Sequence, residues 1–246
     1  MLLEIDNFEQ FRVFFDVIYD VTELIELQLF QDKMVCSILD KSHSRFMSAT
    51  FKKDFFSLYE IDDVESVTLF AEDVYKIIKS STKIDNVVLQ TNDDYLICRF
   101  EGKNGNSRIF EFVLPSDHTT SPQPPSLTLP IKFDLNLIDL KQGLNDLKTI
   151  GSTEVQLNVT DEMVSITTGI ETTTNYVSNI PTDVEVDSPV SSRFSLEYVA
   201  QLLKFDKISK VVEIKTDNNF PLIYSFKDEI MGVEINGMIA PRVEVE

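Results

Sequence analysis

The two halves of the chain repeat each other, and this duplication restricts the fold more than any other feature of the sequence. Val74–Lys79 (VYKIIK) corresponds to Val199–Lys204 (VAQLLK) about half the chain later. The same shift aligns Asn92–Asp94 with Asp217–Asn219, and each of these polar triplets follows an apolar run. A repeat of this length indicates a duplicated domain, because the repeats of solenoid proteins are only about 20–50 residues long.

A proline-rich segment separates the two halves. Residues 115–130 contain five of the nine prolines and no Lys or Arg. Because proline lacks a backbone N–H and has a fixed φ, this segment is expected to be neither a helix nor a central strand. We therefore expect an extended connector at residues 115–130, which joins one domain at residues 1–114 to a second at residues 131–246.

Each half shows the same order of a helix, strands, a second helix and further strands. Apolar residues at helical spacing predict helices at Phe8–Tyr19, Ala71–Lys83, Leu135–Thr149 and Ser195–Lys210. Short runs that alternate apolar and polar residues predict half-buried antiparallel strands. These runs are Ile25–Phe30, Met34–Leu39, Val87–Thr91, Leu96–Phe100, Ile109–Leu114, Val155–Val159, Val211–Lys215 and Leu222–Phe226. The expected fold class is α+β, with two similar domains that each contain antiparallel sheets and two helices.

The composition excludes several classes of protein. With 41 acidic and 22 basic residues the net charge is −19, the opposite of a DNA-binding protein with a basic outer face. A hydrophobic content of 43% excludes an acidic disordered chain. No apolar run approaches the roughly 20 residues that span a bilayer, and no signal peptide is visible, so no membrane association is expected. Cys36 and Cys98 are expected to be buried, reduced thiols of a cytosolic protein.

No catalytic or metal-binding motif is present. The chain has two histidines and lacks H-E-x-x-H, C-x-x-C, G-x-S-x-G, Walker A and G-x-G-x-x-G patterns. Asp40, Ser42 and His43 could suggest a catalytic triad, but triad geometry is formed in space, and a polar turn is the simpler interpretation. We therefore expect no enzymatic activity, no cofactor and no metal site.

The basic residues are concentrated in the predicted helices. These helices hold nearly equal numbers of basic and acidic residues, so the excess negative charge lies elsewhere in the chain. In the second helix of each half the lysines recur every three or four residues and therefore share a face. A solvated face with favourable helix-dipole interactions is the simpler interpretation of this pattern alone, and a DNA contact is the alternative.

The C-terminal segment Met238–Glu246 ends an apolar strand with a short acidic tail. A frayed terminus is the simpler interpretation, and a docking strip for a partner peptide is the alternative.

Taken together, these features resemble the PCNA-type sliding clamps, and especially their archaeal members. The resemblance covers essentially the whole chain. It is carried, in the order found in the family, by Leu39–His43 (LDKSH), Ile150–Ser152 (IGS), Phe194–Tyr198 (FSLEY), Asn219–Leu222 (NFPL) and Ala240–Arg242 (APR). It implies the DNA clamp fold and a closed homotrimeric ring of six domains whose helices line a central hole.

The resemblance also implies a function and a set of partners. The chain is expected to encircle double-stranded DNA without sequence specificity, as a DNA polymerase processivity factor and a docking platform for replication and DNA repair enzymes. Expected partners are DNA polymerase, a clamp loader of the replication factor C type, and flap endonuclease and DNA ligase, which bind through PIP-box peptides. The expected location is the cytoplasm, or the nucleus in a eukaryote. Two alternatives stay open, namely a subunit of a heterotrimeric or checkpoint-type clamp, and an acidic β-rich interaction module without a DNA role.

Three groups of site residues follow from the resemblance. The expected DNA-facing residues are Arg12, Lys76, Lys79, Lys83, Lys141, Lys148, Lys204, Lys207 and Lys210. The expected partner-peptide pocket consists of Leu39, His43, Ser44, Pro124, Pro125, Leu127, Pro221, Met238, Ile239, Ala240 and Pro241. The expected subunit interface pairs the edge strands Arg108–Leu114 and Thr174–Ile180 through Arg108, Phe110, Phe112, Tyr176 and Ser178. Ser44 departs from the family, which usually has an apolar residue at this position.

Overall fold

A computed structural model describes most of the chain. The described residues are 1–6, 8–19, 21–80, 86–92, 95–102, 104–116, 120–124, 126–169 and 174–242. The chain forms two compact units. The first consists of residues 1–41, 47–123 and 227–235, and the second of residues 42–46, 124–226 and 236–246.

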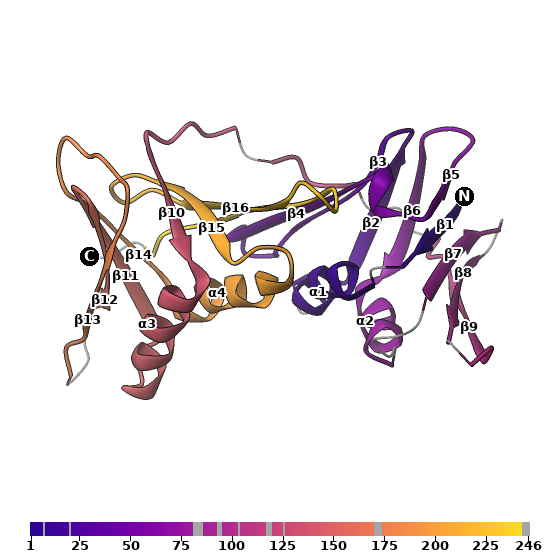
Figure 1. Cartoon of the computed structure of the whole chain (residues 1–246), viewed down its shortest axis with the longest axis horizontal. Helices are drawn as coiled ribbons and strands as arrows, with labels where there is room; N and C mark the ends of the chain where they lie inside the picture. Colours follow the sequence, from indigo (N-terminus) through magenta and orange to yellow (C-terminus); the bar gives the residue numbers. More distant parts are fainter. Residues whose placement is uncertain are drawn as a thin grey trace. The chain divides into compact units, whose positions relative to one another are not determined.

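In its described residues, the N-terminal half contains two antiparallel groups of strands and two α-helices (Figure 1). One group has the order β5 (Leu58–Glu60), β1 (Leu2–Ile5), β7 (Asn86–Thr91), β8 (Tyr95–Glu101) and β9 (Ser107–Val113). The other has the order β6 (Glu65–Phe70), β2 (Leu24–Phe30), β3 (Lys33–Leu39) and β4 (Arg45–Lys52). The helices are α1 (Phe8–Ile18) and α2 (Ala71–Ser80), and a short 3₁₀ turn covers Lys53–Phe55.

The C-terminal half has the same kinds of element. One group of strands has the order β10 (Ile131–Asn136), β15 (Val211–Thr216), β16 (Leu222–Asp228) and β17 (Val233–Ile239). The other has the order β13 (Val177–Pro181), β12 (Met163–Thr168), β11 (Glu154–Thr160) and β14 (Val190–Ser195). The helices are α3 (Leu137–Thr149) and α4 (Leu196–Ala200), and a 3₁₀ helix at Gln201–Lys207 continues α4.

The strand orders confirm the duplication that the sequence predicts. The order β1-β7-β8-β9 in the first half is repeated as β10-β15-β16-β17 in the second. The order β6-β2-β3-β4 is likewise repeated as β14-β11-β12-β13. In both halves one helix follows the first strand of the repeat, β1 or β10. The other helix precedes the strand pair β7-β8 or β15-β16. The expected α+β class with two similar domains is therefore confirmed.

The second helix of the C-terminal half differs from the expected continuous α-helix at Ser195–Lys210. Its buried apolar residues recur every third position, at Leu196, Val199, Leu202, Phe205 and Ile208. A spacing of three drifts around an α-helix but stays on one face of a 3₁₀ helix, which has three residues per turn. The chain therefore changes from α to 3₁₀ after Ala200 and keeps these residues in the core.

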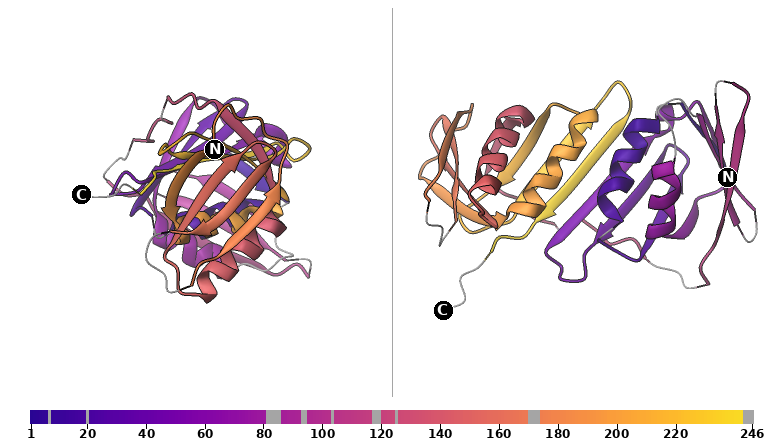
Figure 2. Two further views of the ribbon diagram at one scale, coloured as in Figure 1. Left: turned by 90° about the vertical axis from the view of Figure 1, so that its left-hand side faces the viewer. Right: turned by 90° about the horizontal axis from the view of Figure 1, so that it is seen from below.

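In each unit the two helices lie side by side against the strands (Figure 2, right). The apolar face of α1 packs into a phenylalanine-rich core, where the ring centroids of Phe11 and Phe15 are 4.7 Å apart. The opposite faces of the helices carry the charged residues. None of the helices within the described ranges is long and apolar enough to cross a membrane.

Candidate nucleic-acid interface and partner pocket

The outer face of α2 carries two of the expected DNA-facing lysines, Lys76 and Lys79, and both are exposed. Lys76 Nζ lies 2.8 Å from a carboxylate oxygen of Glu72 and 3.9 Å from one of Asp73. The hydrogen bond to Glu72 raises the pKa of Lys76 above its usual value. Lys76 is therefore a cation held between two carboxylates on its own helix.

Lys79 has a different surrounding, which is built from two tyrosines. Lys79 Nζ donates a hydrogen bond of 3.2 Å to the hydroxyl of Tyr75 and lies 5.3 Å from the centroid of that ring. The Tyr75 ring stacks on Tyr19 at the end of α1, with centroids 3.7 Å apart and planes 10° from parallel. The sequence predictions did not include these tyrosines. The i, i+4 spacing of Tyr75 and Lys79 was the signal available for them.

Arg12, the expected DNA-facing residue of α1, is paired with a carboxylate of its own helix. Arg12 is half-buried, and its Nε lies 3.3 Å from a carboxylate oxygen of Asp16 one turn further on. Lys83, the remaining expected cation of the first half, lies outside the described residues.

The helices of the second unit expose five of the expected lysines. Lys141 and Lys148 lie on the outer face of α3, and neither contacts a carboxylate within the described part of the chain. Lys204, Lys207 and Lys210 are exposed on the 3₁₀ helix and just after it. Lys210 Nζ lies 3.3 Å from Asp206. Exposed lysines therefore lie on the helices of the second unit, as they do on α2 of the first.

The C-terminal segment and the turn at residues 42–46 lie together in the second unit. The backbone N–H of Ala240 donates to the Ser44 carbonyl at 2.8 Å, so the structure joins two of the expected pocket residues directly. Arg242 fixes the end of this segment, because its Nη1 lies 2.6 Å from Glu154. Its backbone N–H also donates to the Arg193 carbonyl at 2.7 Å.

The remaining expected pocket residues differ in exposure. Met238, Pro241 and Pro221 are half-buried, and His43, Pro124 and Leu127 are exposed. Ile239 is 1% exposed and belongs to the core of the second unit. Leu39 lies half-buried at the end of β3 in the first unit, and Pro125 lies outside the described residues. The side chain of Ile239 is therefore not available at the surface of the second unit.

The two strands expected to pair between subunits are both edge strands. β9 is the last strand of its sheet, and β13 is the last strand of its own. Both expose apolar side chains, with exposed fractions of 56% for Ile109, 65% for Val113 and 61% for Val177.

The five named interface residues have different surroundings. Arg108 Nη1 donates to the Ser80 carbonyl at 3.0 Å, and its guanidinium lies over the Phe100 ring. Phe110 and Ser178 are half-buried, whereas Phe112 is 8% exposed and lies in the core of the first unit. Tyr176 donates a hydrogen bond of 2.8 Å to Asp146 of α3.

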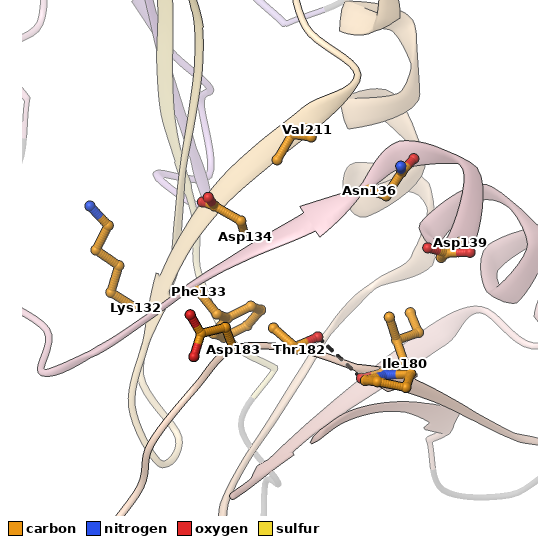
Figure 3. A pocket seen from close by; sticks show the side chains of 10 residues that line it. Lys132, Phe133, Asp134, Asn136, Asp139, Ile180, Thr182, Asp183 and Val211 are labelled. Atoms are coloured by element: carbon orange, nitrogen blue, oxygen red, sulfur yellow. Dashed lines mark hydrogen bonds between the residues drawn. The ribbon is translucent and has the colours of Figure 1, made fainter. Parts of the chain in front are cut away.

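A pocket of about 560 Å³ in the second unit includes Ile180, the last residue of the expected interface strand, and none of the residues named individually for the three expected sites. It lies between β10, the start of α3 and residues 180–183, and the carboxylates of Asp134, Asp139 and Asp183 line it (Figure 3). Lys132 at its rim is 2.7 Å from Glu213. Among the described residues, no group of three His, Cys, Asp or Glu side chains could hold a metal ion.

Comparison with known proteins places these features in a family. The family model described as Rad9 matches residues 15–219. The DNA polymerase sliding clamp of Methanothermobacter thermautotrophicus is 26% identical over 235 residues, which cover 96% of this chain and 95% of that protein. DNA polymerase sliding clamp 2 of Saccharolobus solfataricus is 27% identical over 215 residues, which cover 84% of each chain.

Solved structures show the same fold at lower sequence identity. A chain of the PCNA2–PCNA3 complex from Sulfolobus tokodaii has a TM-score of 0.86 at 19% identity, with 99% of this chain and 100% of that chain covered. PCNA from Thermococcus kodakaraensis also has a TM-score of 0.86, at 17% identity, with 98% and 99% covered. The chain therefore belongs to the Rad9 family, and its fold is that of the PCNA-type sliding clamps.

Proposed function

We propose that this protein is a DNA sliding clamp, which encircles duplex DNA and acts as a processivity factor for DNA polymerase. The observation that carries the proposal is the presence of exposed lysines on the helix face of both units of an otherwise strongly acidic chain. Lysines form flexible contacts to phosphates, and phosphate contacts contain no sequence information. Such contacts suit a protein that must move along DNA.

The proposed assembly is a closed homotrimer with six clamp domains. Each subunit supplies residues 1–114 and 131–246 as domains and residues 115–130 as the connector. Pairing β9 of one subunit with β13 of the next would satisfy both free strand edges and cover their exposed apolar side chains. Because this contact is head-to-tail, repeating it generates a ring when the rotation closes. A heterotrimer, as in a checkpoint-type clamp, is the alternative outcome of a mass measurement.

The second proposed activity is the recruitment of enzymes, and the chain itself is proposed to have no catalytic activity. PIP-box peptides of DNA polymerase, flap endonuclease and DNA ligase would dock on the segment around Ala240, beside the turn that contains Ser44. A clamp loader of the replication factor C type would open and close the ring. The proposed location is the cytoplasm, together with the chromosome. The side chains that a PIP-box peptide buries in such a docking site usually dominate the binding energy.

The direct experiment measures assembly and polymerase stimulation on the same preparation. Size-exclusion chromatography with light scattering should give three times the subunit mass of 28.1 kDa. With a clamp loader and ATP, the protein should lengthen the products of a DNA polymerase on primed circular DNA. The control is primed linear DNA with free ends, from which a ring slides off. Stimulation that is the same on both templates contradicts encirclement, and a stable monomer contradicts the homotrimer.

A further inference from the structure

The two exposed lysines of α2 offer different environments to a phosphate. Lys76 with its neighbours Glu72 and Asp73 forms a group with one excess negative charge. A phosphate that approaches Lys76 is therefore repelled by two carboxylates while it is attracted by one ammonium group. Lys79 contacts no carboxylate within the described ranges, and its neighbour is the neutral hydroxyl of Tyr75. Electrostatics therefore favours Lys79 over Lys76 as the phosphate ligand of this helix.

The hydroxyl of Tyr75 is arranged to act with Lys79. Because Lys79 Nζ donates to the Tyr75 oxygen, that oxygen acts as an acceptor and its O–H remains available as a donor. The stack between Tyr75 and Tyr19 fixes the ring that carries this hydroxyl. Tyr19 is 38% exposed, so the stacked pair lies at the surface and not in the core. A donor held in place loses less conformational entropy when it binds than a free side chain does.

We propose that Lys79 and the Tyr75 hydroxyl together form the main DNA phosphate contact of the first unit. Arg12, which is paired with Asp16, and Lys76 contribute little to this contact. The inference rests on the proposed function, because it takes the DNA backbone as the ligand. It goes beyond that function by separating a working cation from its neutralised neighbours and by adding an uncharged donor.

The test compares Lys79→Gln with the matched variant Lys76→Gln, which removes the same charge from the same helix face. Binding of the assembled ring to a short labelled duplex is measured by fluorescence anisotropy over a series of salt concentrations. The slope of log K against log salt is negative, and each lost phosphate contact reduces its magnitude by about 0.9. Lys79→Gln should reduce the magnitude by about this amount for each subunit that contacts the DNA, whereas Lys76→Gln should leave the slope unchanged.

Tyr75→Phe separates the hydroxyl from the ring, because phenylalanine keeps the stack with Tyr19. The loss of one neutral hydrogen-bond donor should weaken binding about three- to tenfold at every salt concentration. The slope should stay at the wild-type value, because the phenol releases no counterion. Thermal unfolding of all three variants is recorded beside the wild type to confirm that they fold.

The proposal is overturned if Lys76→Gln reduces the magnitude of the salt slope as much as Lys79→Gln does, or if Tyr75→Phe binds as tightly as the wild type. These results leave the sliding-clamp function intact as long as the wild-type ring stimulates the polymerase on circular DNA. If the wild-type ring neither binds the duplex nor stimulates the polymerase, the proposed function itself fails.

Discussion

At the scale of single residues, Gly237 of β17 shows how closely the second unit is packed. A Cβ atom at this position would overlap the ring of Tyr224, at its Cζ and hydroxyl oxygen. Tyr224 is 1% exposed, so its ring cannot move away into solvent. Glycine is therefore required by the close approach of the Tyr224 ring to the backbone of Gly237 and not by an unusual backbone angle, since Gly237 is not among the glycines with positive φ.

Gly237→Ala is predicted to lower the free energy of unfolding by about 1–3 kcal/mol, the usual cost of overpacking a core. Chemical denaturation measures the effect. Tyr224→Phe in the same chain removes the hydroxyl oxygen and should restore part of the loss, which makes the double variant the control. An unchanged midpoint for Gly237→Ala would contradict this account of the packing.

The two cysteines are predicted to be unreactive in the folded protein. Burial raises the pKa of Cys98 to about 12, and burial together with the nearby Glu26 raises the pKa of Cys36 further. Because the thiolate is the reactive form, almost none of it is present at pH 8. A thiol reagent such as dithionitrobenzoate should therefore label neither residue until denaturant is added. Rapid labelling of two thiols in the native protein would show that they are exposed.

At the scale of elements, α3 is the helix with the clearest N-cap in the described chain. The side chain of Asn136 accepts a hydrogen bond of 2.9 Å from the backbone N–H of Ile138. Asn136 is also the last residue of β10, so this cap fixes where the strand ends and the helix begins. The orientation of Lys141 and Lys148 depends on that start.

Asn136→Ala is predicted to cost about 1 kcal/mol of stability, the usual value for the loss of an N-cap. Asn145→Ala, at an exposed position of the same helix, is the matched control and should be neutral or slightly stabilising, because alanine has the higher helix propensity. Urea denaturation followed by circular dichroism distinguishes the two. Equal effects of both variants would mean that the cap does not contribute to stability.

At the scale of the whole molecule, the free edge of β9 is the feature that most needs a partner. Ile109 and Val113 expose apolar side chains on a strand that pairs with β8 on one side and with no strand of the described chain on the other, and such edges usually favour association. In a closed ring the edge is covered, and an isolated subunit would leave it open.

Ile109→Lys is predicted to weaken trimer formation by at least about tenfold, because it would place a charge in a desolvated contact. Analytical ultracentrifugation over a range of protein concentrations measures the shift from trimer to monomer. Val64→Lys introduces the same charge at a residue that is 64% exposed and lies outside β9, so it should leave the trimer intact. If both variants remain trimers, β9 is not part of the subunit contact.

Much of the fold could be predicted from the sequence because the signals for it are local. The period of the apolar residues located α1, α2 and α3 to within a few residues, and the repeated motifs established the duplication that the strand orders confirm. The 3₁₀ helix after α4 was missed, although its three-residue spacing is visible in the sequence. The shared helix face of the lysines could be predicted for the same reason, since helical spacing alone predicts which side chains share a face.

The tertiary structure decided which groups surround those lysines. Glu72 beside Lys76 can be read from the i, i+4 spacing, but the stack of Tyr75 on Tyr19 joins two helices that are distant in the sequence. Likewise, only the folded chain places the Ala240 backbone on Ser44 and the ring of Tyr224 against Gly237. By itself the sequence determined the elements and the distribution of charge, because these depend on near neighbours. Contacts between distant residues depend on packing, which the three-dimensional structure alone specifies.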